Sequence, residues 1–90
     1  MKNSQEYFDL ISQNRLENAL QLIDRLIKDN PHDSLMLFER GKLRWKMGDR
    51  AGATGDYAKS VEINPESPAK YALEQADEIA SFFNPDLYNP

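Results

Sequence analysis

The sequence predicts an all-α fold of antiparallel helix-turn-helix repeats, and three observations support this fold: an internal repeat, apolar residues at helical spacing, and helix-breaking residues at matching boundaries. The dipeptide Asn30-Pro31 returns 34 positions later as Asn64-Pro65. A fixed period of this length is typical of repeat architectures. The same offset pairs several other residues: Ala19 with Ala53, Ile23 with Tyr57, Ile27 with Val61, Asn14 with Gly48, and Leu37 with Tyr71.

Apolar residues in the first copy recur at intervals of three and four positions, which is the spacing of one helix face. They are Leu16, Ala19, Leu20, Ile23, Leu26 and Ile27, and the second copy carries a thinner version of this face at Ala53, Tyr57, Ser60 and Val61. We expect five helices, over residues 3–13, 15–29, 34–47, 49–63 and 67–82.

Turn and capping residues agree with these boundaries. Gly48 lies between two helical patterns, where a left-handed backbone conformation is needed, and Asn14 occupies the equivalent place because asparagine tolerates that conformation. Ser67 precedes Pro68 as an N-cap precedes a proline in the first turn of a helix. The second helix of each copy is expected to end before the proline of its Asn-Pro dipeptide.

Small, aromatic and proline residues also recur at fixed places, at Gly41, Gly48-Asp49, Ala53, Tyr57 and Pro65 in the second copy and at Leu10, Ala19, Ile23 and Pro31 in the first. This pattern resembles the tetratricopeptide repeat (TPR) family, whose period is also 34 residues. The resemblance implies a right-handed superhelical array in one domain over residues 1–90. Its parts would be repeat 1 at about 1–33, repeat 2 at about 34–67, a C-terminal capping helix at about 67–82 and a tail at 83–90.

The sequence departs from the family pattern at five positions. Tyr7 and Gln75 stand where the family has a small residue, so we expect the first helix to pack at a different angle. Arg40 and Arg44 replace an apolar and an aromatic residue, and Ser60 makes a mild replacement of alanine or a similar small residue.

The resemblance further implies a concave groove that binds a partner, lined mainly by the first helix of each repeat. Transferring the family's positions gives Phe8, Leu35, Phe38, Glu39, Lys42, Trp45, Lys46, Leu73 and Ala76 as partner-binding residues. Such a groove is apolar with two lysines one turn apart, which suits a peptide with a hydrophobic anchor and a nearby acid. The alternative is that the three aromatic residues are simply core, as helix-spaced aromatic residues usually are.

Some family members hold a partner's C-terminal carboxylate with a clamp of lysine, asparagine and arginine on three successive first helices. The corresponding positions hold Ser4 and Phe8, then Glu39, then Ala69 and Leu73. The clamp is absent, and we expect no binding of the chaperone tails that it recognises.

Composition limits the chemistry of the chain. Its 90 residues include no cysteine and one histidine, His32, which excludes thiolate metal sites and cysteine nucleophiles and leaves no recognisable triad. We expect no catalysis, no metal site and no cofactor. Gly48, Gly52 and Gly55 lack the strand and the Gly-Lys-Ser/Thr sequence of a phosphate loop. The last two are expected to be tolerated weaknesses in a helix, or else a place where another helix approaches closely.

Charge is distributed unevenly. Five of the eleven basic residues lie between positions 40 and 50, whereas Lys70 is the only basic residue among six acids after position 60. Solvated faces with intramolecular ion pairs are the simplest interpretation. A basic strip around Trp45 that meets an acidic partner or RNA is a second interpretation, and head-to-tail self-association is a third. The net charge of −4 disfavours nucleic acid as a partner.

From the resemblance and the absence of catalytic groups we expect a protein–protein interaction module, an adaptor or scaffold that binds a peptide or helix of another protein. The alternatives are a self-associating structural unit and, more weakly, an RNA-binding protein. We expect a cytoplasmic protein, since no apolar run is long enough for a membrane span and no apolar leader is evident. The apolar residues Phe83, Leu87 and Tyr88 predict a tail that packs on the array or enters a groove.

Overall fold

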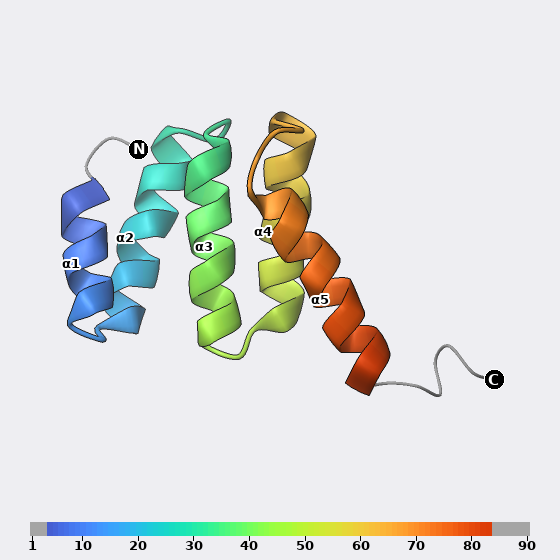
Figure 1. Cartoon of the computed structure of the whole chain (residues 1–90). Helices are drawn as coiled ribbons and strands as arrows, with labels where there is room; N and C mark the ends of the chain where they lie inside the picture. The colour runs from blue at the N-terminus through green and yellow to red at the C-terminus, as the bar shows by residue number, and fades with distance from the viewer. Residues whose placement is uncertain (1–3, 84–90) are drawn as a thin grey trace.

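A computed structural model describes the backbone of residues 4–83 and the side chains of residues 4–76. The described part is all-helical and contains no strand (Figure 1). Its helices are α1 (Ser4–Ser12), α2 (Leu16–Asp29), α3 (Ser34–Lys46), α4 (Arg50–Ile63) and α5 (Ala69–Phe83). Each helix lies within two residues of its predicted bounds, which confirms the predicted all-α architecture.

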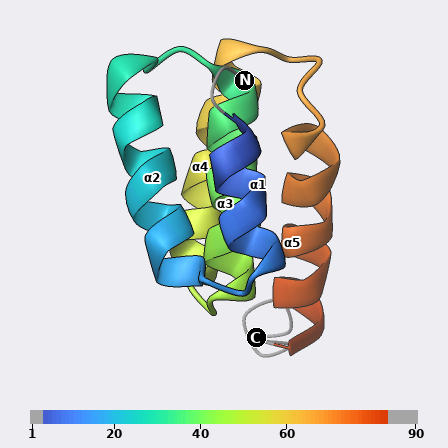
Figure 2. The ribbon, with the colours of Figure 1, turned by 90° about the vertical axis from the view of Figure 1, so that its left-hand side faces the viewer.

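Each helix packs against the next one in the sequence, so that α1 contacts α2, α2 contacts α3, α3 contacts α4 and α4 contacts α5. Successive helices run in opposite directions (Figure 1). Figure 2 shows α2 and α5 on opposite sides of the molecule, with α1 and α3 between them. The face that looks toward the viewer in Figure 1 therefore presents α1, α3 and α5.

The turns between helices follow the predicted chemistry. Asn14 and Gly48 both adopt positive φ, at 58° and 90°, which confirms that they are equivalent left-handed positions. α2 and α4 stop at the residue before the asparagine of their Asn-Pro dipeptides. The Asp33 carboxylate caps α3 by accepting hydrogen bonds from the backbone N–H groups of Leu35 and Met36, at 3.1 and 3.2 Å.

Two clusters of buried side chains form the core. The first joins α1, α2 and α3 through Tyr7, Ala19, Leu22, Ile23, Met36 and Leu43. The second joins α4 and α5 through Ala53, Tyr57 and Ala69, against which Phe38, Trp45, Val61, Ala72 and Leu73 pack. The core is thus divided along the array, and α3 contributes to both parts.

The two helix pairs fill one equivalent position in opposite ways. Gly41 of α3 lies so close to α4 that an added Cβ would stand 2.5 Å from Cε1 of Tyr57. The equivalent residue of α1, 34 positions earlier, is Tyr7, which is 1% exposed. Its hydroxyl donates a hydrogen bond to the carbonyl oxygen of Glu39, at 3.2 Å. Gly41 therefore permits close helix packing, whereas Tyr7 reaches from α1 across to α3.

Two buried serine hydroxyls and one backbone carbonyl link α3, α4 and α5. Oγ of Ser60, which is fully buried, donates to the carbonyl oxygen of Ser34 at 2.6 Å. Oγ of Ser67 lies 2.7 Å from the same hydroxyl and accepts the N–H of Ala69 at 3.1 Å, as expected of a helix cap. Because Ser60 has a single proton, Ser67 is the donor between the two hydroxyls. The expectation that Ser60 is a mild replacement was wrong, since its hydroxyl connects three helices.

The glycines of α4 differ from each other. The backbone N–H of Gly52 donates to the carboxylate of Asp49 at 2.8 Å, and a Cβ on Gly52 would overlap that carboxylate. The interpretation of Gly52 as a tolerated weakness is therefore corrected, because its missing side chain makes room for the N-cap. A Cβ on Gly55 would meet no atom within 4 Å, so Gly55 fits the original expectation.

None of the described helices is long and apolar enough to cross a membrane. The tail at 84–90, with its predicted packing on the array, lies outside the described residues.

Candidate partner-binding face

A small apolar pocket lies between α1 and α3 and is called here the α1/α3 pocket. Its volume is about 190 Å³, and it is lined by Tyr7, Phe8, Ile11, Glu39, Lys42, Leu43 and Lys46. The ring of Phe8 is 44% exposed and meets the buried ring of Tyr7 edge to face, with the centroids 5.3 Å apart. Burial raises the pKa of the Tyr7 hydroxyl, and the nearby Glu39 carboxylate adds to this effect, so the hydroxyl stays neutral.

The two lysines of this pocket have different surroundings. The ammonium of Lys42 lies 2.9 Å from Oε1 of Glu39 and 4.7 Å from the centroid of the Phe38 ring. Lys46, one turn further along α3, is exposed and makes no ion pair within residues 4–76. The rim of an apolar hollow thus carries one lysine that is held in place and one that is available to an acid.

A second pocket lies on the other side of α3, between α3, α4 and α5. It has a volume of about 130 Å³ and is lined by Trp45, Tyr57, Ala72, Gln75 and Ala76. The guanidinium of Arg50 lies 5.0 Å from the Trp45 ring, a cation–π geometry. Burial raises the pKa of Tyr57, with Asp56 and Glu39 adding to the effect.

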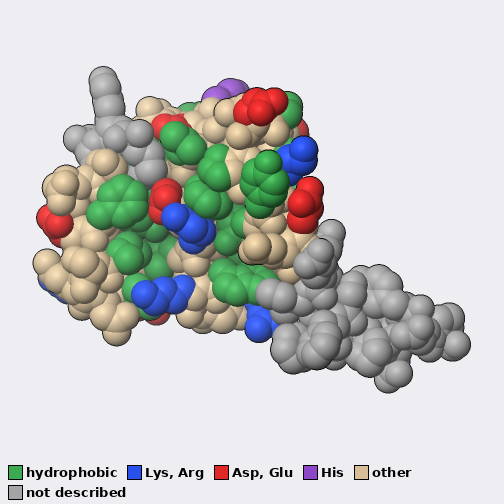
Figure 3. Space-filling model, viewed as in Figure 1, with side chains coloured by type: hydrophobic (Ala, Val, Ile, Leu, Met, Phe, Trp, Pro, Cys, Tyr) green, Lys and Arg blue, Asp and Glu red, His purple; other side chains and the backbone are tan. Residues whose placement is uncertain are grey.

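The nine predicted partner-binding residues divide between these places. Four of them line the α1/α3 pocket: Phe8, Glu39, Lys42 and Lys46. Trp45 and the buried Ala76 line the second pocket, and Leu35 is 46% exposed. Phe38 and Leu73 are half-buried and pack on the second core cluster, without lining either pocket. Figure 3 shows hydrophobic side chains spread across this face, with basic and acidic groups among them.

The structure also answers whether the three aromatic residues belong to the core. Phe8 is exposed and belongs to the surface. Phe38 and Trp45 are half-buried and pack on the second core cluster, and the Phe38 ring lies 6.1 Å from that of Tyr57. Each of these two rings is therefore shared between the core and the surface.

An ion network that sequence reasoning missed connects α2, α3 and α4. The carboxylate of Asp56 on α4 is buried, with 4% exposure. Arg40 of α3 donates to both of its oxygens, from Nε at 2.9 Å and from Nη2 at 2.8 Å, and Arg44 donates to Oδ2 at 3.0 Å. Arg40 also donates to Asp24 of α2 at 3.0 Å. The hydrogen bond to Asp56 is the main reason that the pKa of Arg40 is raised.

This network divides the predicted basic strip. Arg40 and Arg44 are committed to Asp56, and Lys42 lies beside Glu39. The intramolecular-pairing interpretation therefore holds for these three residues. One signal in the sequence could have revealed the network. Asp56 falls 34 residues after Leu22, so an acid stands at a helix position that is apolar in the first copy.

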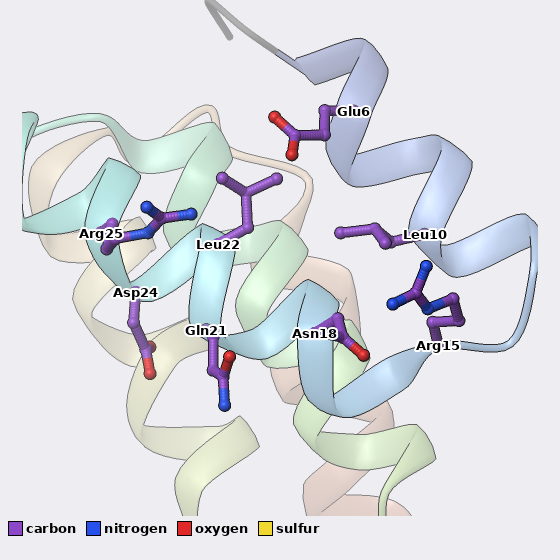
Figure 4. Close-up of a pocket in the computed structure, with 8 residues that line it drawn as sticks. All are labelled: Glu6, Leu10, Arg15, Asn18, Gln21, Leu22, Asp24 and Arg25. Atoms are coloured by element: carbon purple, nitrogen blue, oxygen red, sulfur yellow. The ribbon is translucent and has the colours of Figure 1, made fainter.

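The equivalent part of the first helix pair is an open cleft, here called the α1/α2 cleft. It has a volume of about 740 Å³, and Figure 4 shows its lining residues: Glu6, Leu10, Arg15, Asn18, Gln21, Leu22, Asp24 and Arg25. Glu6, Leu10 and Leu22 are the counterparts of Arg40, Arg44 and Asp56. No ion pair closes this cleft among the described residues, and its size was not predicted.

Within the described residues, no group of three or more histidine, cysteine, aspartate or glutamate side chains is placed to hold a metal ion. Comparison of the chain with protein-family models, with curated proteins and with solved structures gives no match in any of the three.

Proposed function

We propose that the protein is a TPR-type interaction module that binds a peptide or helix of a partner protein at the α1/α3/α5 face. The 34-residue period and the spaced residue matches support two TPRs and a capping helix in a right-handed superhelical array. The single observation that carries the function is the α1/α3 pocket, an apolar hollow with an exposed phenylalanine and two lysines at its rim.

The pocket suits a peptide that offers a large apolar side chain beside an acidic residue. Its volume of about 190 Å³ accommodates one side chain, and complete burial of a leucine or phenylalanine contributes about 1.5–3 kcal/mol. An exposed ion pair with Lys46 contributes at most about 1 kcal/mol. The apolar anchor therefore supplies most of the affinity, and Lys46 selects the orientation of the peptide.

The test is selection of binders from a random peptide library, followed by affinity measurements on selected peptides. We expect selected sequences to place a leucine or an aromatic residue next to an acid. Phe8→Ala and Lys46→Glu should each weaken binding about tenfold, which corresponds to about 1.4 kcal/mol. Lys28→Glu is a matched charge reversal at an exposed position of α2 outside the pocket.

Circular dichroism establishes that each variant is folded. Binding that tolerates both Phe8→Ala and Lys46→Glu would place the partner elsewhere and refute the proposed site. If Lys28→Glu weakened peptide binding equally, the effect of Lys46→Glu would come from the change in net charge alone. RNA binding through the basic strip has less support, since Arg40 and Arg44 are committed to Asp56.

A further inference from the structure

The α1/α2 cleft is an open space whose lining includes two leucines and two arginines, Leu10, Leu22, Arg15 and Arg25. In the second helix pair, Arg40 of α3 donates a hydrogen bond to Asp24 of the neighbouring helix α2, at 3.0 Å. The counterpart of Arg40 in the first pair is Glu6, which is exposed at the edge of the cleft (Figure 4). Glu6 makes no ion pair among residues 4–76, so this edge of the cleft presents an acid to an incoming group.

The last described helix, α5, lies at the opposite end of the array. α5 packs against α4, and Tyr71 of α5 is 67% exposed. Its counterpart 34 residues earlier is Leu37, which is 4% exposed in α3, a helix packed on both α2 and α4. Tyr71 is the most exposed of the large hydrophobic residues in the described part of the chain.

The two ends carry complementary groups. Leu10 and Leu22 face each other in the cleft, with Arg25 and Arg15 on either side (Figure 4). Neither arginine makes an ion pair among residues 4–76. On α5, the exposed Glu74 follows Tyr71 by three positions and so lies on the same side of the helix.

We propose that the α1/α2 cleft of one molecule receives α5 of a second copy. Tyr71 packs against Leu10 and Leu22, Glu74 pairs with Arg25, and Lys70 lies toward the acidic edge at Glu6. The contact joins two different surfaces, so it is heterologous and produces open chains of molecules instead of a closed dimer. It uses a surface other than the α1/α3 pocket and does not depend on the proposed peptide binding.

Sedimentation velocity of the full chain over a concentration series tests this assembly. The wild type should show a mass that rises with concentration. Tyr71→Ser removes an exposed ring that contributes little to the fold, and it should weaken association at least tenfold. Glu62→Arg changes the charge of an exposed residue on α4 (73% exposed side chain) and should leave association unchanged.

A charge exchange makes the test specific. Arg25→Glu alone and Glu74→Arg alone should each stay monomeric, because each places like charges at the contact. An equimolar mixture of the two variants should associate again, since both contacts between unlike molecules then join opposite charges. This recovery distinguishes the proposed contact from a general effect of charge or folding.

Two results would overturn the proposal. One is a wild-type chain that stays monomeric up to about 1 mM, the weak limit of specific association. The other is association that survives Tyr71→Ser and shows no recovery in the mixture, which would place self-contact on another surface. Because Arg25 lies outside the α1/α3 pocket, Arg25→Glu should keep wild-type peptide affinity, and this separates the two proposals.

Discussion

The helix pairs α1–α2 and α3–α4 are related by the 34-residue offset, but they hold together by different means. In the second pair, Gly41 lets the ring of Tyr57 approach the α3 backbone. Asp56 of α4 accepts hydrogen bonds from two arginines of α3. In the first pair, Tyr7 fills the place of the glycine and contacts α3, and apolar residues replace Asp56 and Arg44. The second pair is closed, whereas the first opens into a cleft.

The comparison shows that two copies of one sequence repeat can pack their helices in different ways. At the glycine position of the first pair, the Tyr7 ring joins one buried cluster with Ile23 of α2 and Met36 of α3, so it packs on both neighbouring helices. Without the charged side chains of the second pair, the space between α1 and α2 stays accessible. The three predictions that follow test this contrast, and they run from the largest expected effect to the smallest.

Tyr7→Ala should have the largest effect, since it removes a ring that is 1% exposed at the junction of α1, α2 and α3. We expect the free energy of unfolding to fall by about 3–5 kcal/mol, as measured by denaturant unfolding. Tyr7→Phe keeps the ring and loses only the hydrogen bond to Glu39, so it should cost about 1 kcal/mol. A loss below 1 kcal/mol for Tyr7→Ala would show that this ring does not hold α1 on the array.

Asp56→Ala should lower the free energy of unfolding by about 3 kcal/mol, because it removes the buried carboxylate that accepts from both Arg40 and Arg44 and leaves Arg40 with Asp24 alone. This loss lies at the low end of the range for a broken buried ion pair, since the side chains of Arg40 and Arg44 are 18% and 26% exposed. Asp24→Ala is the control. Its side chain is 48% exposed, and its loss should cost below about 1 kcal/mol. Equal costs for the two variants would mean that burial of Asp56 does not determine the strength of the network.

The glycines of α4 should respond differently to alanine. Gly55→Ala should raise the free energy of unfolding by about 1 kcal/mol, because alanine favours the helix and its Cβ meets no other atom. Gly52→Ala should give none of this gain, since displacing the Asp49 cap costs about 1 kcal/mol. Thermal unfolding of the two single variants measures the difference. An equal rise in melting temperature would show that the cap contributes nothing.

Local features of this chain could be predicted from its sequence, whereas contacts between helices could not. The spacing of apolar residues and the Asn14 and Gly48 turns predicted the five helices closely, because helix ends depend on neighbouring residues. The Asp56 network depends on three helices meeting in space, so the sequence predicted intramolecular ion pairs for its arginines but not their partners. Ser60 was read as a small residue for the same reason, since its partners lie 26 and 7 positions away.

For the candidate site, helical spacing and family positions brought four of the nine predicted residues to the α1/α3 pocket. A core position was predicted for Phe38 only as an alternative, and the half-buried position of Leu73 against the cluster around Tyr57 was not predicted. The α1/α2 cleft was missed as well. The cleft lies between two helices, and the periodicity of one helix does not predict the space between two.

The hydrogen bonds that join the Ser34 carbonyl oxygen to the hydroxyls of Ser60 and Ser67 have a consequence for how the molecule opens. They connect the start of α3, the end of α4 and the first turn of α5, and Ser60 and Ser67 are almost fully buried. Opening any one of these segments leaves a buried polar group unsatisfied, so we expect the three segments to form one cooperative unit in native-state hydrogen exchange. α1 makes none of these hydrogen bonds, and we expect its amide protons to exchange through smaller, local openings.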